Sequence, residues 1–358
     1  MAQFGRFQIQ KSVTRDLGNL NSLHDFSSTL LENSPNIPSL LTELIPLDVE
    51  YMNTSTWEHD DKVMRVALPS DKSYSDRGDN FDARESSKTH LFKIPSFGIQ
   101  THIRPQDALR SRVPGTKDTL DSMDRLVAND IRDIRRSFAL LQEKCLAHLI
   151  TTGTSYVPNG SAPVTDFYTE YAGTSAASRP TVNFVLSDAT KYPAEVGEDA
   201  RALINENLLD GQTVSGYVAL CGRNFFKERI HHPKEEQARV DRTDMWGQDP
   251  LLKRLANFSK QYRMYVGADD IVYVQYDAKI GGVDLINTNE AYIMPAGVEG
   301  MFARRFAPAE TMSYVNTVAL PEYAWRSDNE HTGTHIMYES NFGDYLLSPL
   351  TIIKATKS

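Results

Sequence analysis

The strongest regularity along the chain is an apolar stripe at helical spacing over residues 119–152. Apolar residues recur there every three or four positions, and charged residues fill the other faces. The stripe comprises Leu120, Met123, Val127, Ile131, Ile134, Phe138, Leu141, Cys145 and Leu149. Asp118 or Thr119 can cap its start, and Gly153 stands where a C-terminal cap belongs. A helix of about thirty residues is roughly 45 Å long, so this one should serve as the structural backbone of the protein.

The region before this helix does not have the pattern of a compact domain. Residues 1–50 are rich in Ser, Asn, Thr and Leu with one short apolar run from Ser39, which fits an arm ordered by partners or a frayed terminus. Residues 54–68 and 87–103 have strand character and enclose about twenty mostly polar residues. This pattern predicts a hairpin-like projection that packs on another subunit, or else a mobile surface loop.

Strand and helix patterns alternate after the long helix. Strand-like segments begin at Val164 and Thr181, a helical stretch covers 195–209, and a buried-strand pattern, YVALC, begins at Tyr217. Residues 224–232 have helical character, and two further strands flank a turn over 267–270. The segment from about 181 to 283 therefore predicts an α/β unit, and the remainder is β-rich.

Composition narrows the functional classes. The chain has 358 residues, a formal net charge of −9 and two cysteines. The negative charge argues against a protein that grips nucleic acid by neutralising phosphates. Two distant cysteines exclude a disulfide scaffold and suit a reducing cytoplasm. Neither a membrane-spanning apolar stretch nor the apolar core of a signal peptide is evident, so we expect no membrane association.

Candidate catalytic and metal-binding groups each have a simpler interpretation. His331 and His335 lie four residues apart in HTGTH, which favours a turn or strand rather than a helical metal site. Cys145 belongs to the apolar stripe, so with His148 it does not make a zinc site. His231 and His232 end a predicted helix, where a cationic side chain suits the dipole.

The remaining candidates are acidic or thiol groups. Asp269 and Asp270 fit the turn of a hairpin, so that the pair, even with Asp277, need not be a metal cluster. Cys221 lies in a buried-strand pattern, which is typical of an inert thiol. Nucleophile-elbow, dinucleotide-binding and P-loop motifs are absent from the sequence. We therefore expect no catalytic, cofactor-binding or metal site, and no enzymatic activity.

Three segments are characteristic when taken in order. KIPSFGIQTHIRPQDALRSRVPG begins at Lys93 and leads into the long helix that ends LITTG, AYIMPAGVEGMFARRFAPAET begins at Ala291, and the chain closes on EYAWRSDNEHTGTHIMYESNFGDYLLSPLTIIKATKS. In this order they resemble the major capsid (head) proteins of tailed bacteriophages, the lambda-type capsid family with the Hong-Kong-97-type fold. The resemblance covers most of the chain.

The resemblance implies an α+β fold with a defined order of parts. Residues 1–50 would form an N-terminal arm, and residues 51–104 an extended β-hairpin loop with its base. Residues 105–180 would form a peripheral domain with the spine helix at 119–152, and residues 181–317 an α/β axial domain. Residues 318–358 would be C-terminal strands that return to the peripheral domain.

The same resemblance implies a shell-forming function. Copies of the chain would form hexamers and pentamers of an icosahedral head that encloses double-stranded DNA without sequence-specific binding. Scaffolding, portal and possibly decoration proteins would be partners, and the protein would be assembled in the host cytoplasm and reside in the virion. The charged tip of the extended loop supplies the candidate intersubunit contacts, which are Asp76, Arg77, Asp79, Asp82, Arg84 and Glu85.

Two alternatives remain at this point. The first is the shell protein of a cellular nanocompartment with the same fold. The second is an α/β enzyme that uses His231, His232 or the pair Asp269 and Asp270.

Overall fold

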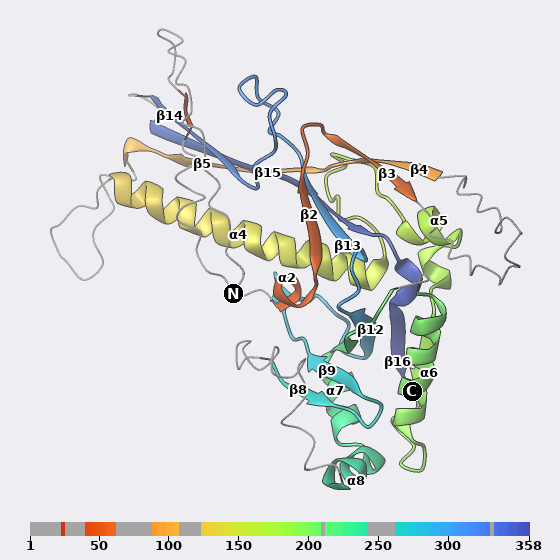
Figure 1. The fold of residues 1–358 in the computed structure, drawn as a ribbon. Helices are drawn as coiled ribbons and strands as arrows, with labels where there is room; N and C mark the ends of the chain where they lie inside the picture. The colour runs from red at the N-terminus through yellow and green to blue at the C-terminus, as the bar shows by residue number, and fades with distance from the viewer. Residues whose placement is uncertain are drawn as a thin grey trace, which may run out of the picture.

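The computed structural model describes residues 23–25, 40–61, 88–106, 123–208, 212–241, 262–329 and 333–358. Two six-stranded sheets organise these residues, and one long helix lies beneath the first of them (Figure 1). The predicted fold class, with separate strands and helices rather than a regular alternation, is confirmed.

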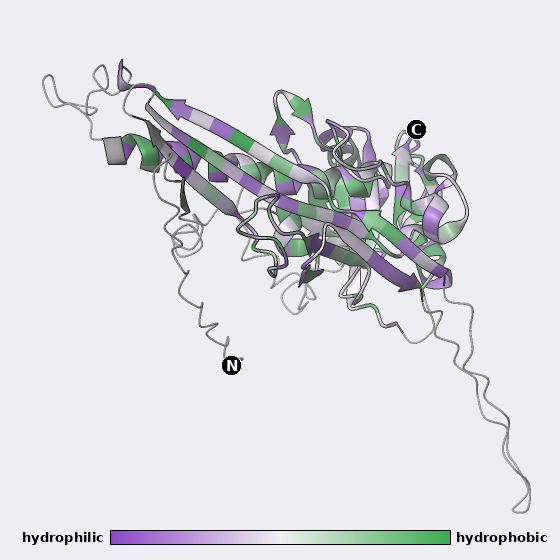
Figure 2. Ribbon diagram, turned by 90° about the horizontal axis from the view of Figure 1, so that it is seen from above, coloured by the Kyte–Doolittle hydropathy of each residue, from purple (hydrophilic) through white to green (hydrophobic). Residues whose placement is uncertain are grey.

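The first sheet is built around the longest strand, β15 (Gly333–Leu346). Its first half pairs antiparallel with β14 (Tyr323–Asn329) and β5 (Ser96–Ile103), and its second half pairs with β13 (Phe302–Phe306). β2 (Leu47–Tyr51) joins β13 in parallel, and β1 (Leu23–Asp25) joins β14. Figure 2 shows hydrophobic and hydrophilic residues alternating along these strands, as a sheet with two different faces requires.

Helix α4 (Met123–Thr152) lies along one face of this sheet. Val127, Ile134 and Phe138 are buried against strand residues that include Ile336 and Tyr338. The helix predicted over 119–152 is confirmed from Met123 onward, and residues 119–122 lie outside the described residues. Gly153 ends it with a φ of 71°, a left-handed conformation that glycine adopts without strain.

The second sheet has the strand order β6, β16, β12, β7, β9, β8. Its members are β6 (Thr181–Phe184), β16 (Ile353–Lys357), β12 (Glu290–Ala296), β7 (Gly216–Cys221), β9 (Ile271–Gln275) and β8 (Met264–Val266). Helices α6 (Pro193–Glu206) and α7 (Arg223–Ile230) bury Ile204 and Phe225 against one face. α8 (Pro233–Asp241) follows α7, and β10 (Lys279–Ile280) and β11 (Val283–Asp284) form a separate small hairpin.

One hydrophobic core connects the two sheets. It contains Leu146 and Ile150 from the last turns of α4, Val218 and Val274 from the second sheet, and Phe302 from the first. Close packing makes such a shared core resist relative displacement of its parts. The two halves of the molecule are therefore joined through the C-terminal end of α4.

Three predictions about the second half need correction. Residues 164–171 are not a strand, because α5 (Phe167–Ala172) is capped by the Asp166 side chain at its start and by Gly173 in a left-handed conformation at its end. β13 lies in the first sheet, although it was expected within the 181–317 unit. β16 lies in the second sheet, because η2 (Pro349–Thr351) turns the chain and places Ile353 between β6 and β12.

Candidate functional site

The six predicted contact residues lie outside the described residues. Asp76, Arg77, Asp79, Asp82, Arg84 and Glu85 fall between β3 (Thr56–Asp61) and β4 (Lys88–Lys93), and the structure describes only these two arms. The arms pair antiparallel, with Asp61 opposite Lys88 at the end of the register. Of the arms predicted over 54–68 and 87–103, the pairing of 56–61 with 88–93 is confirmed, and residues 62–68 lie outside the described residues. Residues 96–103 are not part of the hairpin, because β5 pairs with β15 in the first sheet.

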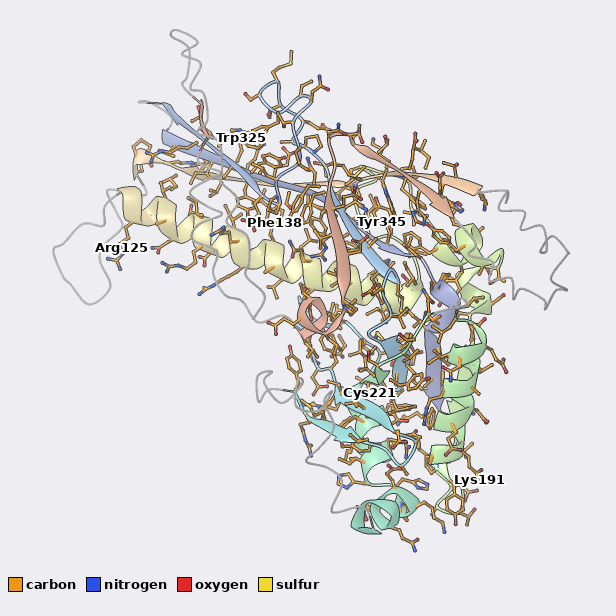
Figure 3. The ribbon with its side chains drawn as sticks, viewed as in Figure 1. Arg125, Phe138, Lys191, Cys221, Trp325 and Tyr345 are labelled. Carbon is orange, nitrogen blue, oxygen red and sulfur yellow. The ribbon has the colours of Figure 1, made fainter. Side chains whose placement is uncertain are left out.

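Aromatic side chains fix the hairpin to the first sheet. Trp57 on β3 and Phe92 on β4 lie opposite each other, and both rings approach Tyr345 on β15, with centroids 4.8 and 5.2 Å away. Tyr345 is labelled in Figure 3. All three side chains are buried. Buried aromatic pairs at such distances contribute about 0.5–1.5 kcal/mol each beyond the area that they bury. The base of the hairpin is therefore held rigidly.

A second attachment joins the hairpin to α5. The buried His90 places Nδ1 3.0 Å from Glu170 Oε2, and Lys88 Nζ donates to the backbone oxygen of Glu170 at 3.0 Å. His90 is also 4.6 Å from the ring of Tyr171. Since His90 and Lys88 lie on β4, these contacts define the direction in which the hairpin leaves the body.

Buried charge strengthens the first sheet beneath the hairpin. Arg304 on β13 and Asp344 on β15 lie opposite each other and form two hydrogen bonds, of 2.6 and 2.9 Å, with both side chains almost fully buried. Arg304 also donates to Gln142 of α4 at 3.2 Å. A buried pair of this kind is costly to break, because removal of one partner leaves an uncompensated charge.

The next residue faces the other way and binds β2. Arg305 donates to Asp48 Oδ2 at 2.7 Å and lies 3.2 Å from Glu50 Oε2, and its guanidinium is 4.7 Å from the centre of the Trp57 ring. β2 precedes the hairpin in the chain, so Arg305 connects β2, β13 and the hairpin base.

Glu143 connects the N-terminal segment to both sheets. Its Oε1 accepts a hydrogen bond from the Leu41 backbone N–H of α2 (Leu40–Leu44) at 3.1 Å and one from the Tyr276 hydroxyl at 2.6 Å. Glu143 and Tyr276 are buried, and burial together with Glu143 raises the pKa of Tyr276, so the hydroxyl remains a donor. One carboxylate of α4 therefore holds α2 and the end of β9.

An apolar surface lies on the loop between β13 and β14. In residues 307–322, Met312 is 95% exposed, Val315 60% and Val318 66%. Two contacts fix the base of this loop to β14. The ring of Tyr314 packs on the buried Tyr323 at a centroid distance of 4.7 Å, and the Tyr323 hydroxyl accepts the Leu320 N–H at 2.7 Å. The three side chains are presented to water by a packed base, as at surfaces that contact a partner.

Asp269 and Asp270, the acidic pair considered for catalysis, lie in different environments. Asp269 is fully buried, where it receives a hydrogen bond from the Tyr273 hydroxyl at 2.7 Å and one from Arg229 at 3.2 Å. Burial raises the pKa of Asp269, against the effect of Arg229. Arg229 also binds Glu235, so these charges join α7, α8 and the turn before β9. Asp270 is exposed in that turn with a φ of 59°, which confirms the predicted hairpin turn.

The neighbouring histidines also have structural positions. His231 follows the last residue of α7 and is exposed, as predicted for a helix end. His232 is buried, with Nδ1 accepting the Lys234 N–H at 3.3 Å and Nε2 3.1 Å from the Asp188 carbonyl oxygen. This pattern assigns the proton of the neutral ring to Nε2. His231 and His232 thus do not converge with Asp269 on one site.

The other candidate groups lie apart. Cys145 packs against Phe306 and Phe342, whereas His148 contacts Thr154 Oγ1 at 3.2 Å. Cys145 and Cys221 are both buried, and burial raises the pKa of both thiols. Asp277 pairs with Arg223 at 3.6 Å. His335 is on β15, stacked on His102 at 3.9 Å, as the strand interpretation requires, and His331 lies outside the described residues.

The described part of the chain contains neither a metal-binding cluster nor a membrane-spanning helix. Within the ranges given above, no three His, Cys, Asp or Glu side chains are grouped so that they could hold a metal ion. Among the helices described, none is long and apolar enough to cross a membrane.

Several residues that organise the structure were not identified from the sequence. Glu143, Arg229 and Arg304 each occur in segments with many charges, where a buried charge is not distinguishable from an exposed one. For Arg304 a signal existed, since FARRF places two arginines inside an apolar strand pattern. Charged residues are rarely fully buried unless paired, so this pattern could have predicted a buried ion pair.

Known proteins show similarity over most of the chain. A family model described as phage major capsid protein E matches residues 28–357. The major capsid protein of Pseudomonas phage KPP10 is 28% identical over 279 residues, which is 74% of this chain and 76% of that protein. A crystal structure of a protein assigned as the capsid protein of a prophage of E. coli CFT073 aligns with a TM-score of 0.57 and 12% identity, over 94% of this chain and 100% of that one.

Proposed function

The chain belongs to the phage major capsid protein E family, and from this membership we propose that its copies form the hexamers and pentamers of an icosahedral head that encloses double-stranded DNA. The predicted resemblance to tailed-phage major capsid proteins is confirmed, and so are the capsid fold and the shell-forming function. The protein is a subunit of a multimeric shell and a component of the virion.

We propose the following division of the chain in this shell. Residues 1–50 act as an N-terminal arm, 51–104 as the extended loop and its base, and α4 as the spine of the peripheral domain. The second sheet with α6, α7 and α8 acts as the axial domain, whose copies meet around the five-fold and pseudo-six-fold axes. The rigid attachment of the hairpin through Trp57, Phe92 and His90 supports a loop that reaches a neighbouring subunit in a fixed direction.

The apolar loop is the observation that carries the assembly proposal. Met312, Val315 and Val318 expose apolar surface on a loop with a packed base, and burial of such surface between copies is the principal favourable term in association. The charged residues predicted as contacts, Asp76 to Glu85, remain proposals. Exposed ion pairs are worth about 0–1 kcal/mol each, so we assign most of the contact free energy to apolar burial.

The proposed role is structural rather than catalytic. Membership of a capsid family supports this, as do the structural positions of Asp269, His231 and His232. The nanocompartment alternative has less support, because the family and the relative from Pseudomonas phage KPP10 are both phage capsid proteins. Scaffolding, portal and decoration proteins as partners, and assembly in the host cytoplasm, are further parts of the proposal.

Electron microscopy and sedimentation of the purified full chain test this function. We expect closed shells, formed by the chain alone or with a scaffolding protein. The triple variant Met312→Ser, Val315→Ser, Val318→Ser should keep the thermal stability of the subunit and lose shell formation. Val283→Ser, which removes a valine that is 69% exposed on β11, is the matched control. Only monomers or small oligomers of the unaltered chain under every condition would overturn the proposal.

A further inference from the structure

Helix α4 presents two chemically different faces. One face packs on the first sheet, and the opposite face carries basic side chains. Arg125, Arg132 and Arg136 are exposed there, on the N-terminal half of the helix. Their spacing of seven and four residues places them along one side of the helix. Figure 3 shows Arg125 pointing away from the sheet.

Two exposed carboxylates lie on or beside this side of α4, one of them Glu43 of α2, which packs on α4. Of the α4 side chains that the structure describes, Asp133 is the only exposed carboxylate, and it lies 3.4 Å from Arg136. Both partners are more than half exposed, and such pairs are weak and screened by salt. The face is therefore net positive, although the whole chain carries a charge of −9.

The opposite side of the first sheet has the reverse character. The loop at 307–322 projects there (Figure 1) and contains no lysine or arginine. Of its two glutamates, Glu322 pairs with the buried Arg135 of α4 at 3.0 Å, and Glu310 is exposed. Asp48 and Glu50 are also more than half exposed and point away from α4, since Arg305 binds them while Arg304 faces Gln142 of α4. Charge is thus separated across the sheet.

We propose that the exposed face of α4 lines the inside of the shell and contacts the phosphates of the enclosed nucleic acid. This inference rests on the proposed function and adds an orientation and a ligand chemistry to it. Guanidinium groups match phosphate geometry with two parallel hydrogen bonds. The line from Arg125 to Arg136 is about 17 Å long at 1.5 Å per residue, and double-stranded DNA offers about one phosphate every 1.7 Å.

The expected strength of the phosphate contacts suits a shell that encloses DNA. Two or three cationic contacts per subunit give weak, salt-sensitive binding without base recognition. The remaining negative charge of the chain keeps that binding from becoming tight. Repetition over many subunits would still order the outermost layer of the enclosed duplex against the wall.

Salt dependence of duplex binding by the unassembled full-length chain tests the phosphate contact. The variant Arg132→Gln/Arg136→Gln removes two exposed charges from α4, and Lys191→Gln/Lys227→Gln removes two exposed charges near the second sheet as a matched control. Each phosphate contact contributes about 0.9 to the slope of log K against log salt. We expect the α4 variant to lower the slope with a 30-bp duplex by about 1.8, and the control to leave it unchanged.

An equal slope for both variants would overturn the phosphate contact. The other occupant of a basic helix face is an acidic protein segment, for which poly-glutamate is the probe. Weaker poly-glutamate binding by the α4 variant, with unchanged duplex binding, would assign the face to a protein and overturn the proposal.

Thiol labelling of assembled shells tests the orientation. Both native cysteines are buried, so single cysteines introduced by Arg132→Cys on α4 and by Glu58→Cys on the outer side of the hairpin report their own exposure. With a bulky polymer-linked maleimide, we expect both to react in the unassembled chain and only Glu58→Cys to react in shells. Equal reaction of Arg132→Cys in shells would overturn the orientation while leaving shell formation intact. Failure of the unaltered chain to form shells would instead contradict the proposed function.

Discussion

Removal of the hydrogen bonds to Glu143 is expected to destabilise the junction between the two sheets. The Glu143 carboxylate accepts from the Leu41 N–H and from the Tyr276 hydroxyl through the same oxygen. Glu143→Gln keeps an acceptor oxygen but removes its charge, and Tyr276→Phe removes one donor without a change of shape. The two substitutions therefore separate the charge of the acceptor from the number of bonds.

The expected changes in the free energy of unfolding follow from the two hydrogen bonds to Glu143. A hydrogen bond to a charged group contributes about 1.5–3 kcal/mol and one between neutral groups about 0.5–1.5 kcal/mol. Glu143→Gln weakens two bonds by about 1 kcal/mol each, so the free energy of unfolding should fall by about 2 kcal/mol. Tyr276→Phe deletes one charged bond and should also cost about 2 kcal/mol. Once the Tyr276 bond is gone, Glu143→Gln weakens only the Leu41 bond, so the double variant should lose about 3 kcal/mol and show a coupling of about 1 kcal/mol.

Urea denaturation of the unassembled chain measures these differences, followed by tryptophan fluorescence and circular dichroism. Tyr192→Phe, at a side chain that is 53% exposed, is the control and should change stability by less than about 0.5 kcal/mol. Independent groups add within about 0.3–0.5 kcal/mol. If the costs of Glu143→Gln and Tyr276→Phe add within that range, then the two residues do not share the bond described above.

Two further predictions concern the end of α4. In urea denaturation, Gly153→Ala should destabilise the subunit by more than Gly160→Ala. Both glycines have positive φ, but only at Gly153 would the new Cβ lie 2.3 Å from the ring of Tyr168. Equal losses of stability in the two variants would contradict this reasoning. Burial, together with Lys144, lowers the pKa of His148 in the folded chain below its ordinary value of 6.5. Between the folded and the unfolded pKa of His148, the folded chain therefore binds fewer protons than the unfolded chain. The folded chain consequently loses stability as pH falls through 6.5. His148→Gln should reduce the difference in urea midpoint between pH 7.5 and pH 5.5, and an unchanged difference would count against the assignment.

Local pattern was sufficient to predict the elements whose residues interact with near neighbours in sequence. The stripe of α4 and its end at Gly153 follow from helical spacing and from glycine in the left-handed region. The arms of the hairpin follow from alternation between polar and apolar residues. α5 was missed, because its aromatic residues favour a strand and the decisive cap comes from one side chain, that of Asp166.

Long-range pairing was not accessible in the same way. β16 has the pattern of any buried strand. Only its pairing with β6 on one side and β12 on the other assigns it to the second sheet. Likewise, the charge of Arg229 is compensated by Asp269, forty residues away, and by Glu235. Such partners are chosen by topology, so a single sequence shows the charges but not which of them are buried together.

The distribution of buried charge and exposed apolar surface in this chain is consistent with a subunit that folds before it assembles. Arg229, Arg304 and Glu143 are buried with partners from the same chain, so the body needs no neighbour to compensate them. The apolar core is likewise continuous between the sheets within one chain. Met312, Val315 and Val318, in contrast, lie outside that core, and their side chains lose water only if another surface covers them. Substitution of these three residues should therefore change assembly and leave folding intact, whereas substitution at the buried charges should change both.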